Sequence, residues 1–463
     1  MHWQNPHPGR ALHRLTRRAA IRAAALPAAA LVTVGLGACG PAAVPVRPVT
    51  VKPKTVVTFS PVPWGAPQER QDLYAAVLKP FLDKNPGIDV RLTFQARGNL
   101  SATSAAIVAG TAVDVFEDFQ IGPSLMEGGY LLDLSPYLSA ANEDLSIFPP
   151  TQLGYWNLNG HQYAMPVSIE SMVTAVNTGA IRALGLTPPS DTWDYQDAGT
   201  LFQNAARITG SASSHRYGGS FYLYGSLAYP ETFYLEQFGG SYVRRSDLAS
   251  CNLASRGSVS AGEYIYPLLQ KGICTTNWAS GKLFNAGNLV VTLAGTWMLP
   301  QFAMIPPSIE WEFLPMPRGP VESATFGSPA FYGIPSTTKV ADAAWALLEW
   351  MSFTPYLQTA NMKFGLLPPA SLRLYPDWVT VVESAAPPLR GKNLQAFTAA
   401  TAHIIDSYFE YDTTQAFSLI NHWAMQVLHQ GVSVKAGFTQ ATQQVNALEA
   451  RAAGAAALSS TSK

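Results

Sequence analysis

Apolar residues recur with two distinct spacings in the part of the chain that follows the N-terminal segment. Residues 55–65 are a β-branched run that ends in a loop with Pro and Gly, and residues 68–85 carry apolar side chains at helical spacing. Residues 88–94 then alternate as a strand, and a helix at 101–110 leads to a buried strand at 112–119. This strand–helix order predicts an α/β protein with a mainly parallel sheet covered by helices.

Two later segments read as strands that pass from one domain into another. Residues 163–177 contain no turn signal and are long enough to leave one sheet and enter a second, and residues 326–335 predict a second such crossing. Apolar helices and one buried strand account for most of the rest, at residues 198–209, 258–271, 288–297, 341–351 and in the C-terminal third. The pattern indicates two lobes joined by a hinge, and a frayed tail at 454–463.

The first 38 residues have the charge-then-apolar layout of a signal peptide. The basic part carries no acidic residue, and the apolar part from 23 to 38 is shorter than the roughly twenty residues that span a membrane. The segment ends in Leu-Gly-Ala-Cys39, which resembles the lipobox of bacterial lipoproteins. We expect a lipid on Cys39, a Pro-rich tether at 39–54, and an extracytoplasmic, membrane-anchored protein. The pair Arg17-Arg18 leaves both Sec and Tat export open.

The remaining 410 or so residues are too many for a single hydrophobic core. Their composition limits the kinds of partner that they can bind. Removing the five signal arginines from the 30 basic residues leaves 25, against 30 acidic ones. Nucleic acid is therefore an unsuitable partner, because phosphate binding needs clustered basic residues. Only 13% of residues are charged, whereas 11% are aromatic, a balance that favours neutral ligands.

The two cysteines of the body, Cys251 and Cys274, form an even pair in an oxidising compartment. They predict a disulfide that closes a loop of about 24 residues. The alternative is two buried free thiols.

Eight segments in order resemble the family 1 extracellular solute-binding proteins, the sugar-capturing subunits of bacterial ABC importers related to maltose-binding protein. They are FLDKNPGIDVRLTF, AGTAVDVFEDF, NGHQYAMPVSIESMVTAVN, LGLTPPSDTWDYQDA, FNAGNLVVTLAGTWML, WEFLPMPRGP, FGSPAFYGIP and ADAAWALLEWM. Gly287-Asn288, Leu293 and Gln196 depart from the family pattern, which warns against copying its ligand specificity.

The resemblance implies a type II periplasmic-binding-protein fold with a ligand cleft between two lobes and two or three crossing segments. The lobes would comprise residues 55–168 with 330–353, and 169–329 with 354–453. It also implies a monomer that binds a sugar and ABC permease subunits, with no cofactor and no metal.

A sugar has apolar ring faces and a rim of hydroxyls, so its sites combine aromatic platforms with carboxylates. Trp297 resembles the stacking Trp of the family, with core packing as the alternative. Glu117 and Asp118 follow a buried strand, where neighbours point to opposite faces, so one of them is expected in the cleft. Trp64, at the end of the first strand, is placed either to stack on the sugar or as an exposed loop residue. Glu170 in the hinge strand either binds ligand or braces the hinge.

Weaker candidates come from other parts of the chain. Tyr229 and Glu231 correspond by position to a ligand-contacting segment of maltose-binding relatives, and Tyr408 comes from the predicted C-terminal helices. Phe331 and Tyr332 could reach the cleft from the second crossing, although that strand also needs apolar residues for packing.

The sequence therefore predicts a sugar-binding lipoprotein without enzymatic activity. It contains none of the motifs G-x-S-x-G, H-E-x-x-H, C-x-x-C or the P-loop. Two alternatives stay open: the same fold with another small solute such as glycerol phosphate or a polyamine, and a lipid-anchored glycoside hydrolase.

Overall fold

The computed structural model describes residues 53–61, 67–94, 100–118, 125–126, 128–209, 214–221, 232–243, 250–276, 281–327, 330–405 and 413–461. The predicted signal peptide, Cys39 and all but the last two residues of the predicted tether lie outside these ranges. Among the residues described, no helix combines the length and the apolar character needed to cross a membrane.

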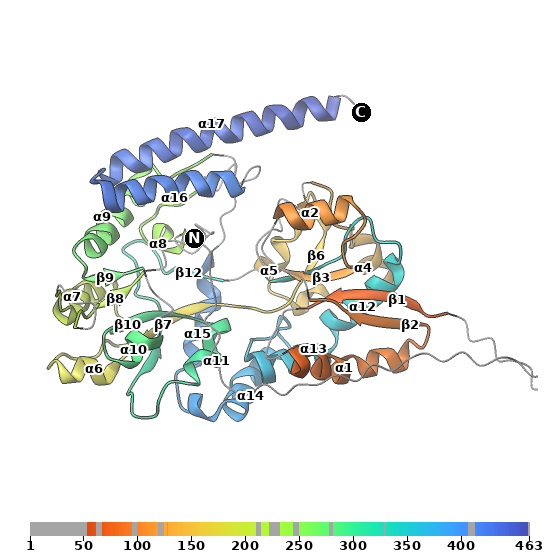
Figure 1. Cartoon of the computed structure of the whole chain (residues 1–463), viewed down its shortest axis with the longest axis horizontal. Coiled ribbons are helices and arrows are strands. Elements are labelled where there is room, and N and C mark those ends of the chain that lie inside the picture. Colours follow the sequence, from red (N-terminus) through yellow and green to blue (C-terminus); the bar gives the residue numbers. More distant parts are fainter. Residues whose placement is uncertain are drawn as a thin grey trace, which may run out of the picture. The chain divides into compact units, whose positions relative to one another are not determined.

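A five-stranded sheet organises the first lobe (Figure 1). Its strands run in the order β2 (Ile88–Leu92), β1 (Thr55–Ser60), β3 (Val115–Asp118), β13 (Phe331–Gly333) and β6 (Ala164–Pro166). The first three are parallel, whereas β13 is antiparallel to both of its neighbours. The predicted strand–helix–strand opening is thereby confirmed.

Helices cover both faces of this sheet because its strands are apolar on both sides. On one face, Tyr74, Leu78 and Phe81 project at helical spacing from α1 (Pro67–Lys84) into a core shared with α12 (Ala341–Phe353). On the other face, Ile107 of α2 (Leu100–Val108) packs in a second core with Phe116 and Phe331.

A three-stranded antiparallel sheet organises the second lobe, in the order β10 (Val291–Gly295), β7 (Met172–Val176) and β11 (Glu312–Leu314). Every residue of β7 is buried, since successive side chains enter cores on opposite faces. Residues of α7 (Tyr195–Ala205) and α9 (Arg256–Gln270) fill one core, and residues of α14 (Trp378–Ala385) and α15 (Gln395–Ala400) fill the other.

The predicted long strand at 163–177 is interrupted in the structure. Its first part is β6 in the five-stranded sheet and its last part is β7 in the three-stranded sheet, with residues 167–171 between them. The interruption follows from the change of partner, because the backbone leaves one hydrogen-bond ladder before it joins the next. We call residues 167–171 the first crossing.

The second crossing runs from β12 (Thr325–Phe326) to β13, and β12 pairs in parallel with β14 (Ile404–Ile405). A third connection follows α12. Leu357 in α13 (Pro355–Ala360) and Ala370 pack in the first lobe, whereas Met362 packs in the second. The chain thus continues in the first lobe beyond the predicted boundary at residue 353, because α13 packs against α1.

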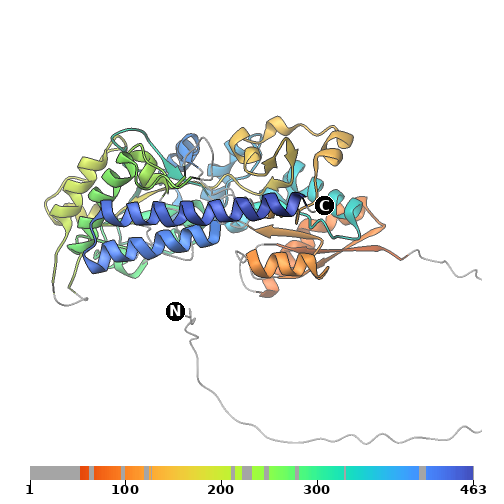
Figure 2. The same cartoon turned by 90° about the horizontal axis from the view of Figure 1, so that it is seen from above.

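A third layer of the second lobe contains α16 (Thr413–Gln430) and α17 (Val434–Thr461), which lie side by side and pack with α9 (Figure 2). Helix α17 continues to Thr461, in place of the frayed tail predicted for 454–463. The remaining elements are short: α4 (Ser135–Ala141), η1 (Leu145–Ile147), α5 (Pro150–Gly154), β4 (Asn157–Leu158), β5 (His161–Gln162), α6 (Thr178–Ala183), β8 (Gly219–Ser220), α8 (Thr232–Gln237), β9 (Cys274–Thr275), α10 (Gly281–Asn285), η2 (Thr296–Met298), α11 (Leu299–Phe302), η3 (Asn361–Gly365), η4 (Tyr375–Asp377), η5 (Pro387–Leu389) and η6 (Thr401–His403).

The predicted disulfide is wrong, because Cys251 and Cys274 are free thiols in different cores. Cys251 is buried with the residues of α16 and α17, and Cys274 is buried beside α7 and α9. Burial raises the pKa of both thiols above the usual range, that of Cys251 to about 11. Two cysteines are enough to form one disulfide, but the fold buries each thiol in a different apolar cluster.

Candidate ligand-binding site

Three chain segments meet at Gly327 in the second crossing. A Cβ atom built on Gly327 would lie 2.8 Å from the carbonyl oxygen of Glu170 and 2.7 Å from Cγ2 of Ile404. Glu170 belongs to the first crossing and Ile404 to β14, so the absence of a side chain at position 327 makes room for the Glu170 backbone and the Ile404 side chain. We call this place the junction.

Glu170 is placed at the junction by the break between β6 and β7. The residue is 6% exposed, and its Oε1 atom accepts a hydrogen bond of 3.0 Å from the Ser168 hydroxyl. A carboxylate at this depth requires polar partners, because burial without them costs several kcal/mol, roughly 3 to 5 when a partner is removed. The position is compatible with both predicted roles, a ligand contact and a brace for the hinge.

Trp297 follows β10 in the short helix η2 and is half-buried. Its indole packs edge-to-face against Phe326 of the second crossing, with ring centroids 5.9 Å apart and planes at 88°. A Cβ atom on Gly295 would lie 2.4 Å from Cζ2 of the same indole. The indole therefore occupies a seat made by Gly295 and Phe326, and part of its surface stays exposed.

Glu117 and Asp118 end β3 and are both 3% exposed. Glu117 pairs with Tyr332 and Asp118 pairs with Phe331 in the antiparallel ladder to β13. Paired residues share a face of the sheet. Glu117 is therefore on the face of the core that contains Tyr332, and Asp118 is on the face of the core that contains Phe331, as predicted for neighbours in a strand.

Phe331 and Tyr332 are packed as core residues in this structure. Phe331 has no exposed surface and its ring lies 4.1 Å from that of Trp156, and Tyr332 packs edge-to-face with Phe59 at 6.3 Å. The packing role that the second crossing needs accounts for both positions. Trp64, Tyr229, Glu231 and Tyr408 lie outside the described residues, as does Cys39.

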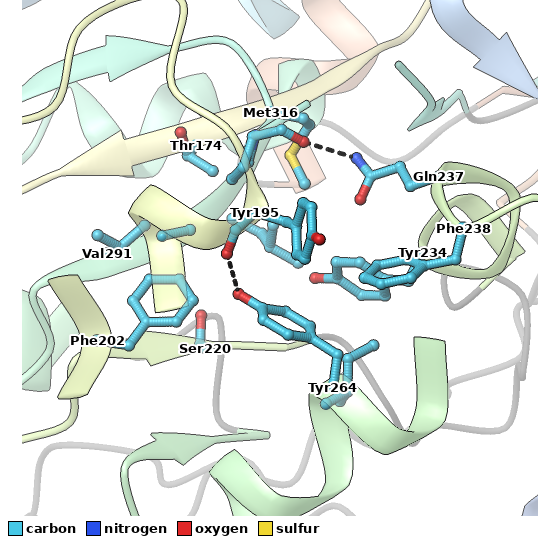
Figure 3. Close-up of a pocket in the computed structure, with 14 residues that line it drawn as sticks. Thr174, Tyr195, Phe202, Ser220, Tyr234, Gln237, Phe238, Tyr264, Val291 and Met316 are labelled. Atoms are coloured by element: carbon cyan, nitrogen blue, oxygen red, sulfur yellow. Dashed lines mark hydrogen bonds between the residues drawn. The ribbon is translucent and has the colours of Figure 1, made fainter. Parts of the chain in front are cut away.

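A ring of tyrosines that the sequence did not single out surrounds a small cavity in the second lobe (Figure 3). Tyr195, Tyr234 and Tyr264 line it, and the Tyr264 hydroxyl donates a hydrogen bond of 2.7 Å to the carbonyl oxygen of Tyr195. Burial raises the pKa of Tyr264 above its usual range. The cavity measures about 30 Å³, far less than the larger groove of the same lobe.

A larger groove of about 430 Å³ lies between the segments at 191–193, 315–318 and 323–325 and the end of α15. Its wall includes Arg318, Trp193 and His403, but none of the predicted ligand residues that the structure describes. The described residues contain no cluster of three or more potential metal ligands.

The family model for bacterial extracellular solute-binding proteins matches residues 76–386, more than half of the chain. The chain belongs to this family. Membership implies a location outside the cytoplasm and a role in binding a solute. No curated protein matches this solute-binding protein.

Solved structures similar to this solute-binding protein share its fold at low sequence identity. One is the ABC substrate-binding protein Lmo0181 from Listeria monocytogenes in complex with cycloalternan, with 19% identity, a TM-score of 0.72, and coverage of 85% of this chain and 99% of that chain. The sugar-binding protein MalE from Xanthomonas citri has 17% identity, a TM-score of 0.66, and coverage of 86% and 98%. The GacH receptor of Streptomyces glaucescens has 18% identity, a TM-score of 0.65, and coverage of 86% and 99%. The predicted two-lobed fold is thereby confirmed.

Proposed function

We propose that this protein captures a sugar, a mono- or oligosaccharide, between its two lobes and delivers it to the permease of an ABC importer. The observation that carries the proposal is the half-buried indole of Trp297, which lies against the second crossing. An aromatic platform next to a hinge suits a ligand with apolar ring faces, because binding can then favour the closed arrangement of the lobes.

Two further features support the proposal. Glu170 supplies a buried carboxylate at the junction, and such groups form strong hydrogen bonds with sugar hydroxyls when water is excluded. The solved relatives described above include proteins with cycloalternan or acarbose bound. This chain would use the same fold for a ligand of the same chemical class.

A thermal-shift screen tests the proposal directly. The probes are maltose, maltotriose, acarbose, cycloalternan and tagatose, with glycerol 3-phosphate and spermidine as the non-sugar arms. A saccharide present at 100 times its Kd would stabilise the folded protein by about 2.7 kcal/mol. Stabilisation by a non-sugar probe alone would contradict the sugar assignment, and release of a cleaved product would replace binding with glycoside hydrolysis.

Trp297→Ala should weaken the stabilising sugar at least tenfold, because loss of an aromatic platform removes both buried area and ring contacts, about 1.5 kcal/mol or more. Tyr356→Ala is the matched control, since Tyr356 is an aromatic residue of α13 that is 45% exposed and stacks on Trp350. Equal affinity of the Trp297→Ala variant and the wild type would remove Trp297 from the site.

We also propose that a lipid on Cys39 holds the protein at the outer face of the cell membrane. The tether at 39–54 would keep the binder near its permease and raise its effective concentration there. Cys39→Ser should release the protein into the medium with its sugar affinity unchanged. If the variant stays in the membrane fraction, the anchor is elsewhere.

A further inference from the structure

The Trp297 indole is held by contacts that the predicted binding role does not explain. One contact comes from its own strand end, where Gly295 leaves the space that the six-membered ring of the indole fills. The other comes from Phe326, which lies 29 positions later in the chain and meets the indole edge-to-face at 5.9 Å. Neither position was a candidate on the basis of the sequence.

Phe326 is itself attached firmly to the hinge. Its strand β12 pairs with β14, in the register Phe326 to Ile405. The preceding residue, Thr325, is 1% exposed and donates a hydrogen bond of 2.5 Å to the carbonyl oxygen of Met172, the first residue of β7. The following residue, Gly327, is the centre of the junction. The backbone that carries the Phe326 ring is therefore attached on both sides to the segments that join the lobes.

We propose that Phe326 is a positioning residue that sets the orientation of the Trp297 indole and couples this orientation to the hinge. This inference rests on the proposed sugar binding at Trp297. Gly295 gives the indole its seat, and the edge of one aromatic ring against the face of the other limits rotation in that seat. The platform is then ordered before the ligand arrives, which lowers the entropy cost of binding.

Two substitutions of Phe326 distinguish a role in orienting the indole from simple packing. Phe326→Leu keeps an apolar side chain of similar size but removes the ring, whereas Phe326→Tyr keeps the ring. We expect Phe326→Leu to bind the stabilising sugar about three- to tenfold more weakly, the range that one aromatic pair supplies, and Phe326→Tyr to restore the wild-type affinity. Gly295→Ala should weaken binding as well, since a methyl group would occupy the indole seat.

Fluorine NMR on protein labelled with 5-fluorotryptophan reports the orientation without any ligand. The resonance of Trp297 is assigned as the one that disappears in Trp297→Phe. In Phe326→Leu this resonance should broaden or split, because the indole then samples more than one orientation, while the other tryptophan resonances keep their line widths. A change of shift alone does not count, since loss of the Phe326 ring current causes one by itself. Phe238→Leu is the matched control, because Phe238 is a half-buried aromatic residue of the same lobe that contacts Tyr195 and Tyr264.

The outcomes distinguish this inference from the proposed function. If the wild type binds no sugar, the proposed function fails, and the resonance still decides whether Phe326 orients Trp297. If the wild type binds sugar and the Trp297 resonance of Phe326→Leu stays single and as narrow as in the wild type, the positioning role is overturned, even when affinity falls. Failure of Phe326→Tyr to restore affinity, with the variant folded by its melting curve, overturns it too.

Discussion

The Thr325 hydroxyl donates a hydrogen bond of 2.5 Å to the backbone carbonyl oxygen of Met172. Thr325 begins the second crossing and is 1% exposed, and Met172 begins β7 directly after the first crossing. This bond links the start of the second crossing to the strand that follows the first crossing. The Met172 carbonyl oxygen is buried, so no water molecule could take the place of the Thr325 hydroxyl as its donor if that hydroxyl were removed.

Thr325→Val therefore should lower the free energy of unfolding by about 1 to 3 kcal/mol, the cost of leaving a buried polar group unsatisfied. Urea denaturation followed by circular dichroism measures the change. Thr439→Val is the control, since the Thr439 hydroxyl bonds to the Lys435 carbonyl oxygen on the exposed surface of α17. An equal loss of unfolding free energy in the two variants would show that the bond at the crossing stabilises the fold no more than an exposed one.

Gly327→Ala tests the junction itself. The added methyl group would lie 2.8 Å from a backbone oxygen of Glu170, so the first crossing would have to shift. We expect a loss of about 1 to 3 kcal/mol in unfolding free energy, typical of overpacking, and a changed sugar affinity because both crossings move. Gly281→Ala is the control, since no atom lies within 4 Å of a Cβ built there. If Gly327→Ala is as stable as the wild type and binds sugar with the same affinity, close packing at the junction is not required.

The regular part of the fold was predictable because periodicity is a local property. A helix was predicted at 68–85 and observed at Pro67–Lys84, and another was predicted at 341–351 and observed at Ala341–Phe353. The single strand predicted at 163–177 was wrong in detail. Alternation of side chains indicates an extended backbone, but it does not reveal that β6 and β7 pair with different sheets.

The candidate site was less predictable, because it depends on contacts between distant positions. Trp297 was found through a motif, whereas no sequence signal marked Phe326 as its neighbour. Phe331 shows the opposite case. Its position in a crossing strand suggested a ligand contact, but in the fold its ring packs against Trp156. The cysteine count likewise says how many thiols could pair, not how far apart they lie.

Asp114 joins three segments of the first lobe through its carboxylate. Its Oδ2 atom accepts hydrogen bonds from the backbone nitrogen and the hydroxyl of Thr58, at 2.8 and 2.6 Å, and Oδ1 accepts one from Thr338 at 2.7 Å. Asp114→Ala should cost about 2 to 4 kcal/mol in unfolding free energy, since bonds to a charged group are worth about 1.5 to 3 kcal/mol each.

Asp114→Asn should recover part of that loss, because the amide oxygen still accepts while the amide nitrogen replaces one acceptor with a donor. Urea denaturation of the three proteins should give unfolding free energies that fall in the order wild type, Asn variant, Ala variant. An Ala variant as stable as the wild type would mean that the Thr58 and Thr338 contacts contribute nothing measurable.

The free thiols give a prediction with a defined pH dependence. Only the thiolate reacts with Ellman's reagent, and burial raises the pKa of Cys251 to about 11, so almost no thiolate exists at pH 8 in the folded protein. The chain with Cys39→Ser should therefore show no reactive thiol when folded and two after denaturation in guanidinium chloride without reductant. A reductant should leave its melting temperature unchanged, because there is no disulfide to break. Finding no thiol in the denatured, unreduced protein would instead establish a bridge between Cys251 and Cys274, and the two cores that hold them would have to rearrange.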